Sequence, residues 1–317
     1  KWWPYIRMLP SPTDLKNSPL FWEENHPSRL ALKTFKSRAI VEIDEWNARY
    51  RRIFPSVHKV PLVKEFFAAL PGVFTQETFN WGAAIMDSRC IWWHNERHMV
   101  PMLDFVNCNE GPDPSVVHST DYDETKDAAV TKAGTEYKKG EQVFENYGQP
   151  NNNYFIYHGF ALEGNTHDCT SLTFEITQEE YSVVPFGNPH VKDLLQDVYL
   201  MRNGKPPSPS SLAAINLCLP PSVGAITLHT WTILAMKAGT IHMYASSSRA
   251  GMPETGLMGL LRQSIEEHLS SIPTDYSIVA DAMVRIYLES ERRNLEALLV
   301  DIAATISGPA ALSFDLT

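Results

Sequence analysis

The amino-acid sequence predicts an α+β fold: helices come first, a compact β region follows, and further helices end the chain. Three patterns support this: helically spaced apolar residues in the first third, short apolar runs between turn residues in the middle third, and renewed helical spacing near the end. The 317 residues suffice for roughly two domains with ordinary cores.

Two helices are predicted in the first third. The first spans roughly Ser37 to Ile53 and carries one apolar stripe, Ile43, Trp46, Tyr50 and Ile53. Pro55 and Pro61 are expected to break it. Thr75 is the expected N-cap of a second helix that ends near Ser88 and Arg89.

The middle third is predicted to be mostly β. Its expected strands are short apolar runs bounded by Gly, Asn, Asp and Pro: Val100 to Val106, Gln142 to Tyr147, and Thr170 to Ile176. The stretch from Asp113 to Lys139 is polar and mixed in charge, so we expect a solvated hairpin or loop there.

The last third is predicted to be helical. Pro206 to Ser211 is linker-like, although six residues could equally form a surface loop. A helical stripe follows: Leu257, Leu260, Leu261, Ile265 and Leu269. Apolar residues from Ile278 to Ile302 then indicate a long final helix or a broken pair, with Thr274 or Asp275 as N-cap.

Charge and apolar runs argue against several partners. The chain has 27 Lys+Arg and 37 Asp+Glu, a net charge of −10, which disfavours nucleic acid and acidic partners. The longest apolar runs are far shorter than the roughly 20 residues that span a bilayer, so no membrane partner is expected. We expect an intracellular, soluble protein, without distinguishing plastid, cytoplasm and nucleus.

The four cysteines and the chain start limit the cellular context. The cysteines are widely spaced, which favours a reducing compartment over a zinc cluster or a dense disulfide framework: Cys90, Cys108, Cys169 and Cys218. The chain begins at Lys1 without a signal-peptide pattern or initiator Met. We expect that either a leader has been removed or upstream residues are missing.

The sequence motifs give little support to a metal site or to a nucleophilic hydrolase site. His94 and His98 are four apart, but Glu96 lies midway between them and no Pro-Cys-x-x-Cys follows, so we expect a polar loop and no metal. Neither a Gly-x-Ser-x-Gly elbow nor a phosphate-cradling glycine loop is present.

Two other segments are apolar runs that end in side chains capable of binding or catalysis. Residues 100–108 run into Asn107-Cys108 at a turn, and residues 139–151 run into Tyr147-Gly148, with His158-Gly159-Phe160 shortly after. Each alone is as well explained by a strand end with an Asx-turn and a packed tyrosine ring. Their occurrence together favours a functional site.

With these segments the chain resembles the SET-domain protein methyltransferases of the branch that contains the Rubisco large-subunit lysine methyltransferase and the actin-histidine methyltransferase. Four elements match in order: Trp81 with Ser88-Arg89, residues 100–107 (Val-Pro-Met-Leu-Asp-Phe-Val-Asn), residues 139–148 (Lys-Gly-Glu-Gln-Val-Phe-Glu-Asn-Tyr-Gly), and His158-Gly159-Phe160 with residues 165–168 (Asn-Thr-His-Asp). The resemblance spans nearly the whole chain, and its middle third is the specific part.

The resemblance implies a SET β-core, without its N-terminal strands, that carries a helical insert and is followed by an all-helical substrate-binding domain. The implied domains are the insert at 1–80, the core at 81–175 and the helical domain at 176–317. It further implies S-adenosylmethionine as the cofactor and a protein, or a protein complex, as the partner.

The resemblance also implies roles for individual residues. Cofactor-binding positions are Arg89, Asn107, Cys108 and Tyr147. Substrate-binding positions are Arg89, Asp104 and His158. Tyr147 is the implied catalytic residue, because a phenol oxygen near the transferring methyl can orient the lone pair of the acceptor amine.

Two departures from the family pattern leave a second function open. Cys108 stands where the family has His, and the family's Gly-x-Gly loop would precede the residues given. The leading hypothesis is a methyltransferase acting on a lysine, with histidine as the other acceptor considered. The alternative is a catalytically inactive SET-like structural subunit or protein-binding module.

Overall fold

The computed structural model describes most of the chain in thirteen stretches. They are residues 2–35, 37–57, 59–69, 72–94, 96–109, 120–133, 136–177, 179–180, 210–218, 228–238, 254–272, 274–276 and 279–307. Residues 206–209 of the linker-like segment lie outside these stretches. Residues 113–119 and 134–135 of the expected 113–139 hairpin also lie outside them.

The chain divides into two compact units. Unit 1 comprises Lys1–His167 and Ser277–Tyr287, and unit 2 comprises Asp168–Tyr276 and Leu288–Thr317. The domain boundaries implied by the resemblance, at 80/81 and 175/176, stay predictions.

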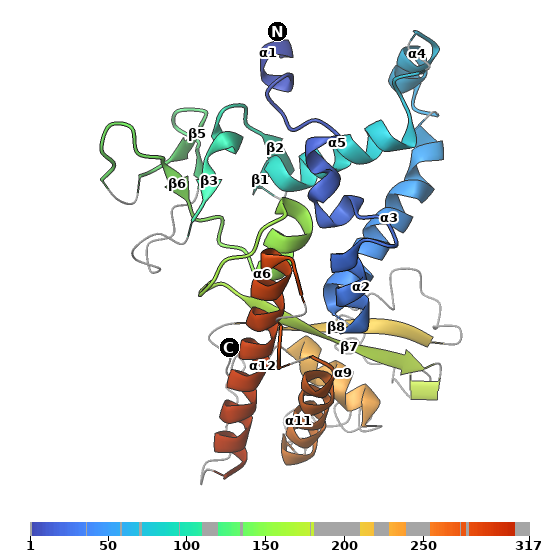
Figure 1. Cartoon of the computed structure of the whole chain (residues 1–317), viewed down its shortest axis with the longest axis vertical. Helices are drawn as coiled ribbons and strands as arrows, with labels where there is room; N and C mark the ends of the chain where they lie inside the picture. Colours follow the sequence, from blue (N-terminus) through green and yellow to red (C-terminus); the bar gives the residue numbers. More distant parts are fainter. Residues whose placement is uncertain are drawn as a thin grey trace. The chain divides into compact units, whose positions relative to one another are not determined.

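Unit 1 combines helices with three short strand pairs (Figure 1). Its helices and helical turns are α1 (Trp3–Ile6), η1 (Asp14–Asn17), η2 (Pro19–Phe21), α2 (Pro27–Thr34), α3 (Arg38–Val57), α4 (Pro61–Ala69), α5 (Gln76–Arg89), η3 (Leu103–Phe105), α6 (Asn151–Asn153) and η4 (Tyr154–His158). Its strands are β1 (Cys90–Trp93), β2 (Glu96–Met99), β3 (Asn107–Cys108), β4 (Thr120–Asp123), β5 (Ala128–Thr131) and β6 (Phe144–Glu145).

Helix α3 confirms the predicted apolar stripe, but it is longer than predicted. Ile43 and Trp46 are buried, whereas Ile53 is 39% exposed. Pro55 lies inside the helix, which ends at Val57, so the prediction that Pro55 breaks it was wrong. Proline is disruptive because it removes one backbone hydrogen bond, and near a helix end that loss affects only the last turn.

Helix α5 begins and ends where its caps predict. Thr75 accepts a hydrogen bond from the Thr78 backbone N–H at 3.2 Å, and the Thr78 hydroxyl receives the Thr75 N–H at 2.9 Å. This reciprocal capping box satisfies two otherwise free N–H groups. The Trp81 indole N–H donates to the Pro10 carbonyl at 2.8 Å, which ties α5 to the N-terminal segment.

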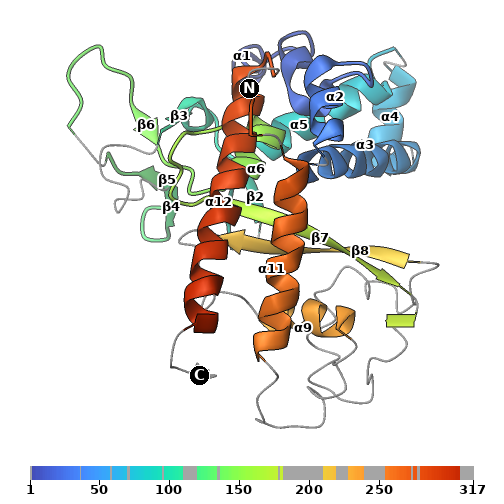
Figure 2. The same ribbon diagram turned by 60° about the horizontal axis from the view of Figure 1, so that its bottom comes forward.

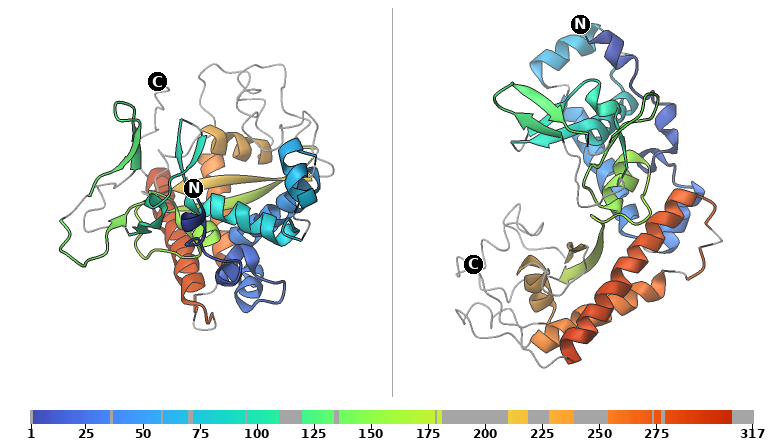
Figure 3. Two further views of the ribbon diagram at one scale, coloured as in Figure 1. Left: turned by 90° about the horizontal axis from the view of Figure 1, so that it is seen from above. Right: turned by 90° about the vertical axis from the view of Figure 1, so that its left-hand side faces the viewer.

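The core of unit 1 lies where three helical elements meet. Helices α3 and α5 run side by side, and the turn η4 contacts both (Figures 1 and 3). Phe155 and Ile156 of η4 are almost completely buried, and the Trp22 indole meets the Phe155 ring at 5.8 Å between centroids. Burial of these large apolar side chains stabilises the unit.

The predicted strand over Val100 to Val106 was wrong. Residues Leu103–Phe105 form a 3-10 turn, and only Asn107–Cys108 pair as a strand. Met102 has φ +79°, a left-handed conformation that no strand residue adopts. The predicted strand over Gln142 to Tyr147 is confirmed only at Phe144–Glu145, and the 113–139 stretch contains the antiparallel pair β4–β5.

Unit 2 is built on one antiparallel strand pair. Strands β7 (Cys169–Thr177) and β8 (Ser210–Cys218) pair along their whole length, so the strand predicted over Thr170 to Ile176 is confirmed. Cys169, which is disulfide-bonded, lies opposite Cys218 in this register.

Among the described residues of unit 2, three helices pack on the strands: α9 (Leu228–Lys237), α11 (Glu254–Ser271) and the portion of α12 (Ala282–Ser307) from Leu288 onward. Helix α11 confirms the stripe predicted over 257–269, and it runs beside α12 (Figure 2). The core of the unit contains Ile233, Leu234, Leu261, Ile265, Leu295 and Ile302.

The final helix is single, and its cap was predicted at the wrong residue. Asp281 accepts the backbone N–H groups of Met283 at 2.9 Å and Val284 at 3.4 Å, which makes it the capping carboxylate in place of Thr274 or Asp275. An Asp at this position also stabilises the positive end of the helix dipole. In the part of the chain that the structure describes, no helix is long and apolar enough to cross a membrane.

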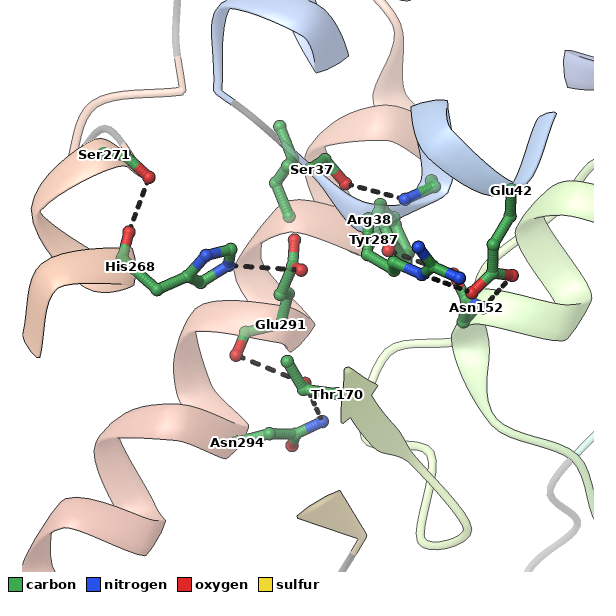
Figure 4. Close-up of polar contacts among 12 residues, drawn as sticks. Ser37, Arg38, Glu42, Asn152, Thr170, His268, Ser271, Tyr287, Glu291 and Asn294 are labelled. Carbon is green, nitrogen blue, oxygen red and sulfur yellow. Dashed lines mark hydrogen bonds and ion pairs between the residues drawn. The ribbon is translucent and has the colours of Figure 1, made fainter. Parts of the chain in front are cut away.

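Each unit contains a network of polar side chains (Figure 4). In unit 1, Asn152 donates to Glu42 at 2.8 Å and accepts from the Tyr287 hydroxyl at 3.2 Å. In unit 2, Thr170 donates to the Glu291 carbonyl and accepts from the Asn294 amide, while His268 lies 3.5 Å from the Glu291 carboxylate.

Candidate functional site

The parallel pair β3–β6 brings the two segments singled out in the sequence together. Asn107 lies opposite Phe144, and Cys108 opposite Glu145. Two residues after β6, the Tyr147 hydroxyl donates a 2.6 Å hydrogen bond to the Val106 carbonyl. The strand pairing and this hydrogen bond therefore bring the two segments together in space.

Burial keeps the Tyr147 phenol protonated. Loss of hydration raises its pKa above the ordinary value of 10, and the nearby Cys108 and Glu145 raise it further. The hydroxyl hydrogen is committed to Val106, which leaves the oxygen lone pairs as acceptors. The geometry suits a phenol that orients a neighbouring N–H group rather than one that removes a proton.

Arg89, the last residue of α5, forms hydrogen bonds with the turn η3. Its Nη1 donates to the Asp104 carbonyl at 3.0 Å and to Asp104 Oδ2 at 3.1 Å. The guanidinium also lies over the Phe105 ring, 5.4 Å from its centroid. The Asp104 carboxylate has no exposed surface, so this charged pair is held largely out of water.

His158 lies beside Tyr147 as a neutral imidazole. The two ring centroids are 5.5 Å apart, and the rings of Tyr154 and Phe160 lie 6.0 and 5.9 Å from His158. Burial among these rings, together with the positive charge of Arg89, lowers the pKa of His158 to about 4. The structure thus brings together Tyr147, His158, Arg89 and Asp104.

Buried amides hold the segment after Tyr147 in place. The Asn151 side chain donates to the Leu162 carbonyl at 2.9 Å and accepts the Leu162 N–H at 2.8 Å. Asn165 donates to the Gln149 carbonyl at 2.9 Å. Gly148 adopts φ +61°, which glycine enters without steric cost, and its N–H binds the Asn146 side chain at 2.7 Å.

The cofactor positions implied on β3 differ in exposure. Asn107 is exposed, while Cys108 is half-buried and forms no disulfide. The Asn109 backbone N–H donates to the Glu145 carbonyl at 3.1 Å, which continues the pairing with β6. Both residues therefore lie on backbone that the strand pair fixes next to Tyr147.

Two kinds of site residue were missed by sequence reasoning. Tyr5 donates to Asp104 Oδ2 at 2.8 Å from 99 positions away, and no local pattern could have indicated that contact. Asn151 and Asn165 lie within quoted motifs, and two asparagines bordering such motifs are a usable signal for buried turn-bracing amides.

The rejected histidine pair lies in the β1–β2 hairpin. His94 is at its turn with φ +52° and lies 3.8 Å from Glu124, whereas His98 stacks on the Trp93 ring at 4.4 Å between centroids. The structure therefore shows a strand hairpin where the sequence predicted a polar loop. Its two histidines make separate contacts.

No protein-family model matches the chain. At the sequence level it is 25% identical over 190 residues to an actin-histidine N-methyltransferase of Danio rerio and 25% identical over 188 residues to that of Homo sapiens. Each match includes 56% of this chain and 30% of the relative, so the chain spans less than a third of the length of these curated relatives.

Solved structures show the fold. The SET domain of LSMT bound to MeLysine and AdoHcy superposes with a TM-score of 0.61 at 17% identity, over 96% of this chain and 71% of that one. Rubisco LSMT bound to AdoMet gives a TM-score of 0.58, also at 17% identity, over 96% and 70%. The fold is that of a SET domain with a helical C-terminal region, and the resemblance to this branch of proteins is confirmed.

Proposed function

We propose that the protein containing this SET fold transfers a methyl group from S-adenosylmethionine to a side-chain nitrogen of another protein. The observation that carries the proposal is the hydrogen bond from the Tyr147 hydroxyl to the Val106 carbonyl, with His158 beside Tyr147 and the Asp104 charge acting on the phenol. The relatives that match in sequence are named actin-histidine N-methyltransferases. One of the solved structures that match in fold is the SET domain of LSMT bound to Lysine and AdoHcy.

We propose that Arg89, Asn107, Cys108 and Tyr147 bind the cofactor. When bound, S-adenosylmethionine would supply a sulfonium methyl group, which the acceptor nitrogen would attack in line while the neutral thioether leaves. The residues fit such a group, because Tyr147 and the Val106 carbonyl offer oxygen atoms and the exposed Asn107 offers an amide. At Cys108 the backbone would make the contact, since its thiol replaces the family's imidazole.

We propose that Asp104, Arg89 and His158 bind the acceptor side chain of the substrate protein. Alignment of acceptor and methyl supplies much of the rate in an in-line displacement. The aromatic surroundings of His158 disfavour charge, so they favour the neutral amine that a lysine must present before it can react. We therefore propose lysine as the acceptor, with histidine as the competing outcome.

The test uses the full-length protein with labelled cofactor and a library of lysine-centred and histidine-centred peptides. We expect label in lysine peptides, identified by mass spectrometry, and a loss of about 100-fold or more in Tyr147→Phe. Tyr122→Phe is the matched control, because its hydroxyl bonds Asp127 in the β4–β5 hairpin. Label that persists undiminished in Tyr147→Phe would contradict the proposal.

Cys108 favours the second candidate function, a SET-like protein-binding module without turnover. A calorimetric titration of the full-length protein with S-adenosylmethionine separates the two. Clear binding supports the enzyme, whereas absence of both binding and methyl incorporation supports the module.

A further inference from the structure

Tyr5 connects the N-terminal helix of the structure to the proposed acceptor site. Within α1 it is 8% exposed, whereas Trp2, Trp3 and Ile6 are all at least 41% exposed. Its hydroxyl donates to Asp104 Oδ2 at 2.8 Å, and its ring lies 5.7 Å from that of Phe105. Tyr5 is thus the buried contact of a helix whose neighbouring side chains are exposed.

The two oxygens of Asp104 have different surroundings. Oδ2 accepts from both Tyr5 at 2.8 Å and Arg89 at 3.1 Å. Among the residues that the structure describes, Oδ1 has no hydrogen-bond partner, although it is buried. A buried acceptor left without a donor costs roughly 1–3 kcal/mol, which is recovered when a ligand brings an N–H group to it.

Two donors from different elements fix the carboxylate. Arg89 extends from the end of α5 and Tyr5 from α1, and both bind the same oxygen. Arg89 alone would allow the carboxylate to exchange its two oxygens by rotation about the Cβ–Cγ bond. Burial and the adjacent carboxylate raise the pKa of Tyr5, so its hydroxyl remains a donor throughout the pH range of activity.

We propose that Tyr5 is a positioning residue of the acceptor site: together with Arg89 it holds Asp104 so that Oδ1 receives an N–H of the acceptor nitrogen. This inference rests on the proposed methyl transfer and adds a residue outside the matched motifs. A displacement of about 1 Å in such a group is worth up to about 100-fold in rate.

The alternative is that Tyr5 only anchors α1 by packing. Tyr5→Phe distinguishes the two, because it keeps the ring against Phe105 and removes only the hydroxyl. Tyr50→Phe is the matched control. Tyr50 also donates to a carboxylate of unit 1, Asp87, at 3.4 Å, outside the acceptor site.

The experiment measures initial rates of methyl transfer by the full-length protein to the best peptide of the library. In Tyr5→Phe we expect kcat/KM for the peptide to fall about 10- to 100-fold, with the dissociation constant of S-adenosylmethionine within twofold of the parent. Tyr50→Phe should keep both quantities within twofold. A Tyr5→Phe protein with unchanged kcat/KM, or with peptide and cofactor binding lowered in parallel, would overturn the inference.

A second readout does not depend on turnover. Crystal structures of the parent and of Tyr5→Phe should show the Asp104 carboxylate rotated or in two orientations only in the variant. An unchanged carboxylate overturns the positioning role. A parent that neither binds cofactor nor transfers methyl contradicts the proposed function, and these crystal structures then still decide whether Tyr5 orients Asp104.

Discussion

In each unit the structure describes a buried carboxylate beside a basic side chain, and the surroundings of these two carboxylates differ. In unit 1, Asp104 has no exposed surface and accepts from Arg89 and Tyr5. In unit 2, Glu291 is 3% exposed and lies 3.5 Å from His268. Neither Glu291 oxygen has a hydrogen bond within the described residues.

A buried charge alone does not identify a functional site. Asp104 lies near the Tyr147 phenol, whose pKa its charge raises, whereas Glu291 lies near His268 of α11 and Thr170 of β7. Under the proposed function the unpaired Asp104 oxygen binds a ligand, and we expect Glu291 to have only a structural role.

The largest expected effect tests the structural role of Glu291. Replacing His268 by Leu removes the polar neighbour that lies 3.5 Å from the buried carboxylate, so we expect unit 2 to lose about 3 kcal/mol of unfolding free energy. Urea denaturation followed by circular dichroism measures it. The double variant His268→Leu/Glu291→Leu should recover most of the loss, and a single variant as stable as the parent would contradict this account.

The next prediction concerns His158 and pH. Its pKa is about 4 in the folded protein against 6.5 as a free side chain, so the unfolded chain binds the extra proton first. Stability should therefore fall by up to about 3 kcal/mol as the pH drops from 6.5 to 4, and level off below.

His158→Phe should flatten this part of the stability curve, because the variant has no proton to bind there. The exposed His94 gives the control, His94→Gln, which should retain the parent's slope. A His158→Phe curve as steep as the parent's would show that other groups cause the acid sensitivity of unit 1.

A smaller effect is expected at the capping box of α5. Thr75→Ala removes the side-chain oxygen that receives the Thr78 N–H, and we expect a loss of about 1 kcal/mol in thermal or urea unfolding. The control Ser264→Ala lies inside α11, where the hydroxyl binds the Leu260 carbonyl. It should be neutral or slightly stabilising, because Ala is the better helix former.

The smallest effect is expected for an exposed ion pair of unit 2. Arg262 and Glu266 lie 2.8 Å apart, with about half of each side chain exposed. Arg262→Ala should change the unfolding free energy by no more than about 0.5 kcal/mol, since water and salt screen such pairs. Urea denaturation at low and high salt measures this change. A loss of several kcal/mol would contradict the expectation that exposed charge pairs stabilise the fold less than buried ones.

Local patterns predicted several elements correctly. The threonine cap located α5, the apolar stripe located α11, and a short apolar run bounded by turn residues located β7. They failed over residues 100–106, because an apolar run becomes a strand only when a partner is available along its length. There Pro101 and the left-handed Met102 lead into a 3-10 turn instead.

Motif order alone places Arg89, Asp104, Tyr147 and His158 in one proposed site and so defines its residue types. Their interactions are apparent only in the folded chain: the bond from Tyr147 to Val106, the low pKa of His158 and the contact from Tyr5 to Asp104. The physical reason is that hydrogen bonding and burial depend on atoms many residues apart, which local spacing does not encode.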